Sequence, residues 1–121
     1  MGASSVLLFA VPASPLAQPW SIMGGNILAA IIGVTCAKII DEPILAAGIA
    51  AALAIAAMFA ARCIHPPSGA VALTAVLGGP AVHAMGYHFV LIPVALNSAL
   101  LLITALFLSL IHISEPTRQA E

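Results

Sequence analysis

Three long runs of apolar residues, at positions 20–40, 44–64 and 89–111, constrain the fold of this chain more than any other feature. A helix needs roughly 20 residues to cross the hydrocarbon core of a bilayer, and each run reaches that length. Hydrophobic residues make up 63% of the chain and charged residues 6%, so the chain could not cover a water-facing surface. We therefore expect an all-α membrane protein with three transmembrane helices.

Two further apolar runs are too short to span and are predicted to be half-helices or re-entrant segments. They lie at residues 6–11 and 71–77, and each leads through a Pro- or Gly-rich loop into a long run. Gly2 and Ala3, shortly before the first run, align with Gly69 and Ala70, just before the second run. Paired short segments of this kind indicate a transporter site built from broken helices. The alternative is two apolar segments that share Gly-Ala by coincidence.

The run at 44–64 is rich in alanine, and small side chains let membrane helices approach closely. We expect this helix to lie inside the bundle, and the same feature is compatible with a homo-oligomer. The chain has no basic patch that would indicate nucleic-acid binding.

Enzymatic chemistry and metal binding have no support in the sequence. No two of the four histidines have the i, i+4 spacing of helical metal ligands, and no carboxylate lies within a predicted span. Cys36 and Cys63 form no CxxC motif and are interpreted as packing residues. Nucleophile and zinc-protease motifs are absent. We expect no enzyme, no metal and no cofactor.

The corner at residues 62–70 carries the most distinctive chemistry. Pro66 and Pro67 end one helix and preset the backbone for the next. Ser68, Gly69 and Ala70 would then offer a capping hydroxyl and free N–H groups at a helix N-terminus, which favours anions. Arg62 precedes His65 by three residues, so both could face one side of the last helical turn.

A purely structural role for these residues is the competing interpretation. Arg62 would then extend toward the lipid headgroups, and His65 would bond a carbonyl group. Gln18, Asn26, Asn97 and Ser98 could equally form interhelical hydrogen bonds.

Several motifs resemble the HPP family of integral membrane proteins, which is named for the triplet His65, Pro66 and Pro67. The resemblance also rests on residues 14–19 and on Gly24 and Gly25, and it covers nearly all of residues 2–107. It implies an all-helical membrane domain, a further hydrophobic segment upstream and, in many bacterial members, a downstream pair of CBS domains. Plant plastid and cyanobacterial members are associated with nitrite transport.

The last residues, 108–121, resemble the translation of a sequencing-library adapter. We therefore predict an HPP-type transmembrane domain at 1–107, which would be partial, and a non-native tail at 108–121.

Two functional hypotheses follow. The first is transport of a small inorganic anion, nitrite being the first candidate, in a bacterial plasma (inner) membrane. The second is a non-transporting membrane anchor or sensory module for attached regulatory domains of the CBS type. For transport, the lipid bilayer and the anion are the expected partners, and the candidate substrate-binding residues are Arg62, His65, Ser68, Gly69, Ala70, Gln18, Asn26 and Asn97.

Overall fold

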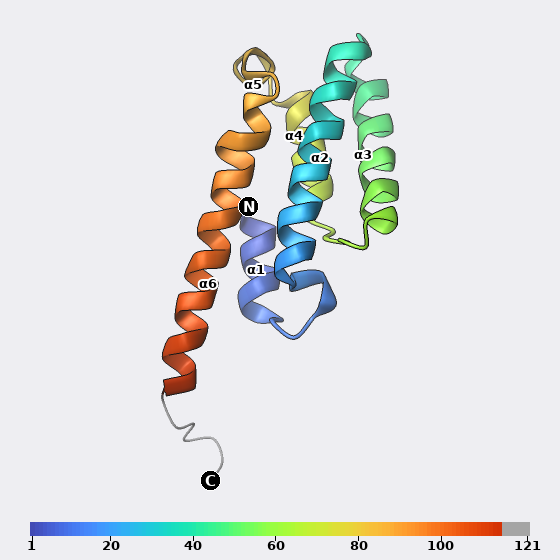
Figure 1. Ribbon diagram of the computed structural model, residues 1–121. Coiled ribbons are helices and arrows are strands. Elements are labelled where there is room, and N and C mark those ends of the chain that lie inside the picture. The colour runs from blue at the N-terminus through green and yellow to red at the C-terminus, as the bar shows by residue number, and fades with distance from the viewer. Residues whose placement is uncertain (115–121) are drawn as a thin grey trace.

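The computed structural model describes residues 1–114, which contain helices and no strand (Figure 1). This confirms the predicted fold class. The helical segments in chain order are α1 (Gly2–Ala10), η1 (Pro15–Ala17), α2 (Pro19–Ile39), α3 (Pro43–Ala60), α4 (Ser68–Leu77), α5 (Pro80–Met85), η2 (Val90–Ala95) and α6 (Leu96–Ser114).

Three segments are long and apolar enough to cross a bilayer: α2, α3 and the run Val90–Ile111, which joins η2 to α6. They match the three predicted spans, except that α3 ends at Ala60 rather than at residue 64. The two short predicted segments are also helical, as α1 and α4. Helix α6 continues to Ser114. The predicted tail lies partly outside the described residues, and its origin stays a prediction.

Helix α2 is the centre of the bundle. Half of its span is buried, compared with 28% for α3 and 11% for Val90–Ile111. In Figure 1, α2 lies between α6 and α3, and its closest packing is against α4 and α3. The prediction that alanine-rich α3 lies inside the bundle is therefore wrong. One face of α3 is buried and carries Ala46, Ala47, Ala50, Ala54 and Met58, while other alanines, such as Ala52 and Ala56, are exposed.

Two glycines of α2 allow this close packing. A Cβ atom on Gly33 would lie 2.7 Å from both the carbonyl oxygen of Ala72 and the Cβ of Ala75, two residues of α4. A Cβ on Gly25 would lie 2.9 Å from the Oγ of Ser68. Because no hydrophobic effect drives helices together in lipid, such backbone proximity is a main source of association.

Prolines and one carboxylate fix where the helices begin. Proline occupies one of the first two positions of η1, α2, α3 and α5, where its missing N–H costs no hydrogen bond. Glu42 caps α3: its two carboxylate oxygens accept hydrogen bonds from the N–H groups of Ile44 at 3.0 Å and Leu45 at 2.6 Å.

Helix α3 ends in a Schellman motif centred on Arg62. Arg62 has φ +55°, its N–H donates to the Phe59 carbonyl, and the Cys63 N–H donates to the Met58 carbonyl. Helical geometry thus stops before Arg62. The prediction that Arg62 and His65 share the last helical turn is wrong for this reason.

We predict that Gly33→Ala lowers the stability of the fold by about 1–3 kcal/mol, because α2 and α4 must separate to admit the methyl group. Gly48→Ala is the matched control, since Gly48 lies within α3 with nothing within 4 Å of its Cβ position. This control should be neutral or slightly stabilising. Unfolding in detergent micelles checks both variants, and equal shifts would contradict the packing account.

We also predict that Arg62→Gly stabilises the fold by about 0.5–1 kcal/mol, since glycine adopts positive φ without a steric penalty. The same unfolding assay applies, with Arg62→Ala as the control that retains the unfavourable backbone conformation. A loss of stability in the glycine variant would show that the arginine side chain itself holds the corner.

Candidate functional site

The two short helices begin beside the same cavity and run away from it in opposite directions (Figure 1). The cavity has a volume of about 300 Å³. Its wall comes from the first turn of α1, the start of α4, and η2 with the first residues of α6. The lining residues are Met1, Ala3, Pro67, Ala70, Val71, Thr74, Phe89, Pro93, Val94 and Asn97.

A break in the third span shapes one side of this cavity. Residues 90–95 contain a kink between two helical stretches, at which Ile92 is extended, with φ −131° and ψ 116°. Pro93 follows, and it cannot donate the N–H that a regular helix requires. The sequence predicted one span at residues 89–111, and the structure places a kink near its start, beside the cavity.

The lining of the cavity is mostly apolar. The start of α4 lies at its wall, but the first N–H groups of α4 donate to the carbonyls of residues 65–67 and offer an anion no free donor. No Asp, Glu, Lys or Arg side chain lines the cavity. Asn97 is exposed and has no hydrogen-bond partner within residues 1–114. Its amide is therefore available to a solute.

His65 does not line this cavity and is fully buried. Its Nδ1 is 2.8 Å from the carbonyl oxygen of Leu16, and its Nε2 is 2.8 Å from Oγ of Ser4. A carbonyl oxygen only accepts hydrogen bonds, so Nδ1 carries the proton and Nε2 of the neutral ring accepts from the Ser4 hydroxyl. The imidazole thus joins the corner to α1 and to η1.

A second buried chain of hydrogen bonds starts at Ser68. Its Oγ donates to Oδ1 of Asn26 at 2.8 Å, and Nδ2 of Asn26 donates to Oγ of Ser98 at 2.9 Å. Ser98 in turn donates to the Val94 carbonyl at 2.8 Å. These bonds connect α4, α2, α6 and η2. The interhelical interpretation is confirmed for Asn26 and Ser98.

The structure corrects the predicted anion site at the start of α4. The N–H groups of Ser68, Gly69 and Ala70 donate to the carbonyls of His65, Pro66 and Pro67 at 2.9–3.1 Å. They are therefore not free to bind an anion. The hydroxyl of Ser68 does not cap the helix, because it donates to Asn26.

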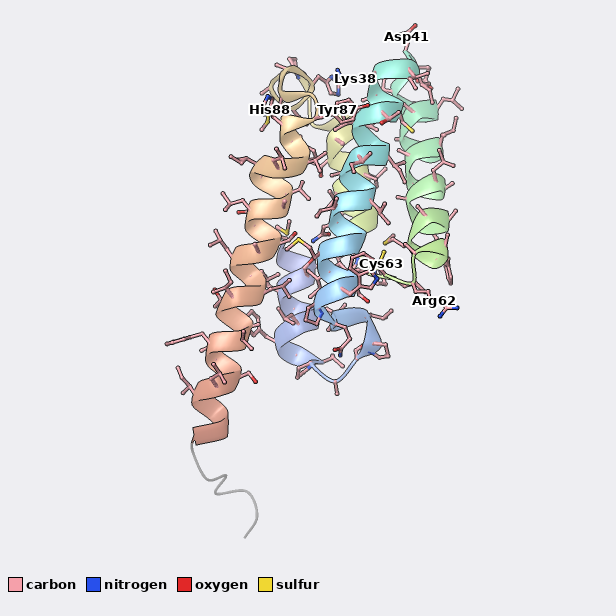
Figure 2. The ribbon with its side chains drawn as sticks, viewed as in Figure 1. Lys38, Asp41, Arg62, Cys63, Tyr87 and His88 are labelled. Carbon is pink, nitrogen blue, oxygen red and sulfur yellow. The ribbon has the colours of Figure 1, made fainter. Side chains whose placement is uncertain are left out.

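The remaining candidate residues do not converge on one point. Arg62 is exposed and projects outward from the corner in Figure 2, while His65 faces the interior. Gln18 lines a different, mostly apolar groove between α1 and α6, where its Nε2 donates to the Ser14 carbonyl. Of the candidates, only Ala70 and Asn97 line the central cavity.

Sequence reasoning missed four residues of this region. Ser4 is a buried partner of His65, and Phe89, Thr74 and Pro93 line the cavity. A hydroxyl inside an otherwise apolar half-helix was a usable signal for Ser4. Within residues 1–114, no three His, Cys, Asp or Glu side chains come together, so no residue set is assigned to a metal.

Comparison with known proteins gives consistent matches. The family model described as "HPP, transmembrane region" matches residues 1–118. A curated transmembrane protein of Dictyostelium discoideum is 37% identical over 111 residues, which cover 88% of this chain and 35% of that protein. A second from the same organism is 35% identical over 108 residues, covering 86% and 38%. No solved structure matches. The chain thus spans little more than a third of the length of these relatives.

We expect substitutions of Asn26 and Asn97 to have different effects on the stability of the fold. We predict that Asn26→Ala lowers stability by about 1–2 kcal/mol, because it leaves the buried hydroxyls of Ser68 and Ser98 without their partner. Asn97→Ala should change stability by less than about 0.5 kcal/mol, since it breaks no hydrogen bond. Unfolding in detergent micelles checks the pair. Equal destabilisation would mean that Asn97 also has a structural partner.

Proposed function

Because the chain belongs to the HPP family of transmembrane proteins, we propose that it forms part of a path for a small inorganic anion across the membrane, with nitrite as the first candidate. The proposed site is the central cavity between the starts of α1 and α4, rather than the outer side of the corner.

One observation carries this proposal: α1, α4 and the kinked third span border one half-open cavity, and the unpaired amide of Asn97 lies on it. The N–H donors of this amide favour a solute with hydrogen-bond acceptors. Half-helices that meet in this way are typical of substrate sites in transporters with inverted repeats.

The size and lining of the cavity support a small polar solute. A water molecule takes up roughly 30 Å³ in the liquid, so about 300 Å³ accommodates a three-atom anion with part of its hydration shell. The Asn97 amide supplies two N–H donors. Thr74 adds a hydroxyl oxygen, whose proton is donated to the Ala70 carbonyl at 2.8 Å.

In this proposal, Arg62 and His65 take different parts from those predicted. His65 holds α1 and η1 against the corner and so fixes one wall of the cavity. Arg62 lies outside the cavity and forms no ion pair within residues 1–114. Substrate binding by Arg62 and Gln18 stays a prediction, whereas the N–H group of Gly69 is occupied by the Pro66 carbonyl.

A non-transporting anchor or sensory module is the second candidate. It is favoured by the complete pairing of buried side-chain polar atoms in the described residues, which a purely structural bundle also requires. The two functions differ in what Asn97 does, because an anchor has no use for an unpaired amide beside a cavity.

The membrane and the oligomeric state stay predictions. The bacterial plasma membrane is the location inferred from sequence, whereas the two matched relatives come from Dictyostelium. A homo-oligomer is compatible with the exposed apolar faces of α3 and α6.

We predict that the protein, reconstituted into liposomes, shows saturable nitrite uptake that falls at least about tenfold in Asn97→Asp, since a carboxylate would repel the anion. Asn97→Leu should reduce uptake less, because it removes only the donors. Arg62→Gln is the control and should retain uptake. Every variant is first checked for equal membrane insertion.

Two results would overturn the proposal in different ways. Loss of uptake in Arg62→Gln with normal uptake in both Asn97 variants would move the site to the corner. An absence of nitrite, nitrate and formate uptake in well-inserted protein would favour the anchor.

A further inference from the structure

Lys38 lies in the last turn of α2, close to α5 and at the opposite end of the bundle from Arg62 (Figure 2). Its Nζ is 5.5 Å from the centre of the Tyr87 ring, and the Tyr87 hydroxyl is 2.9 Å from the Oγ1 of Thr35 on α2. The ring quadrupole attracts a cation over its face. Because Lys38 and Tyr87 are both exposed, this attraction is weak, and it biases the ammonium group toward the ring without fixing it.

No acidic side chain neutralises Lys38. Within residues 1–114 it forms no ion pair, although Asp41 and Glu42 follow closely in the chain. The Glu42 carboxylate is already occupied by the first N–H groups of α3. The charge of Lys38 thus remains available to an anion.

A small, half-open pocket adjoins Lys38. It has a volume of about 100 Å³ and is bordered by α2, α4 and α5. Its lining consists of Val34, Ala37, Lys38, Ala75, Val82, His83 and Gly86. That volume equals roughly three water molecules, which suits a compact anion.

The ends of the surrounding helices do not oppose an anion as strongly as bare C-termini would. The carbonyl of Val76 accepts a hydrogen bond from Nε2 of His83 at 2.7 Å. This bond reduces the negative potential of the C-terminus of α4, and Lys38 in the last turn of α2 offsets that of α2.

We propose that Lys38 and this pocket form a capture site for the same small inorganic anion at one mouth of the path. The inference rests on the proposed transport function and adds a second site to it. Helix α4 connects the two sites: Ala70 and Thr74 line the central cavity, and Ala75 lines the pocket. At 1.5 Å per residue, Ala70 and Ala75 are about 7.5 Å apart along the helix axis.

A lipid headgroup phosphate is the competing source of negative charge for Lys38. A free anion is favoured because the pocket, at about 100 Å³, is too small to admit a phosphate group with its two ester arms. The experiment therefore compares lipid-free detergent with added phospholipid.

Lys38 is the sole lysine of the chain, so its acylation reports directly on the site. The protein in maltoside detergent is treated with a water-soluble amine-reactive ester, and the peptide carrying Lys38 is quantified by mass spectrometry. Sodium nitrite is titrated at constant ionic strength against gluconate, which is too large for the pocket. We expect the labelling rate to fall about twofold when half the sites are occupied.

Two variants sharpen this test. Tyr87→Ala releases the ammonium group and should weaken the protection by nitrite, whereas Tyr87→Phe keeps the ring and should retain it. His88→Ala is the matched control, because His88 is an exposed histidine beside Tyr87 that does not line the pocket. It should leave protection unchanged.

Uptake into liposomes separates this inference from the proposed function. Lys38→Gln should raise the apparent KM for nitrite several-fold and leave the maximal rate nearly unchanged, as expected for a capture site. Protection without uptake would support the pocket and overturn transport. Uptake without protection, or protection by phospholipid alone, would overturn the capture site and leave transport standing.

Discussion

The hydrogen bonds of His65 join the non-helical connections of this apolar protein to one another and to α1. Hydrocarbon offers no partner to an exposed N–H or C=O group, so irregular backbone at membrane depth must be satisfied within the protein. The corner between α3 and α4 and the connection before α2 meet this condition jointly, because the buried imidazole bonds the carbonyl of Leu16 and the hydroxyl of Ser4. The position of α1, and with it one wall of the central cavity, depends on this residue.

The fold can be described as two similar units that run in opposite directions. In Figure 1 the short helix α1 leads down to a turn and α2 returns upward, while α4 leads up to α5 and α6 returns downward. Helix α3 connects the two units. This arrangement is compatible with an inverted repeat that aligns Gly2 and Ala3 with Gly69 and Ala70, and the repeat stays a prediction.

The sequence was sufficient to predict the spans, because their length and lack of charge leave few alternatives in a bilayer. It also predicted both short helices. It named Asn26, His65 and Ser68 as substrate-binding candidates, whereas the structure shows them in internal hydrogen bonds. It could not show which way these side chains turn. Arg62 was misplaced because its positive φ, unusual for arginine, ends α3 early and directs the two residues apart. The N–H groups of residues 68–70 were misjudged because the two prolines leave carbonyls within reach of them.

The central claim is that the cavity beside α1 and α4 is hydrated and favours anions over cations. Cysteine accessibility tests it most directly, since native Cys36 and Cys63 are both buried and should react little. Ala70→Cys would be compared with Leu53→Cys, which lies on the exposed, lipid-facing side of α3. The account predicts that Ala70→Cys reacts with small thiosulfonate reagents, and faster with an anionic than with a cationic one. If Ala70→Cys proves as inert as Leu53→Cys, the cavity is dry and the claim is contradicted.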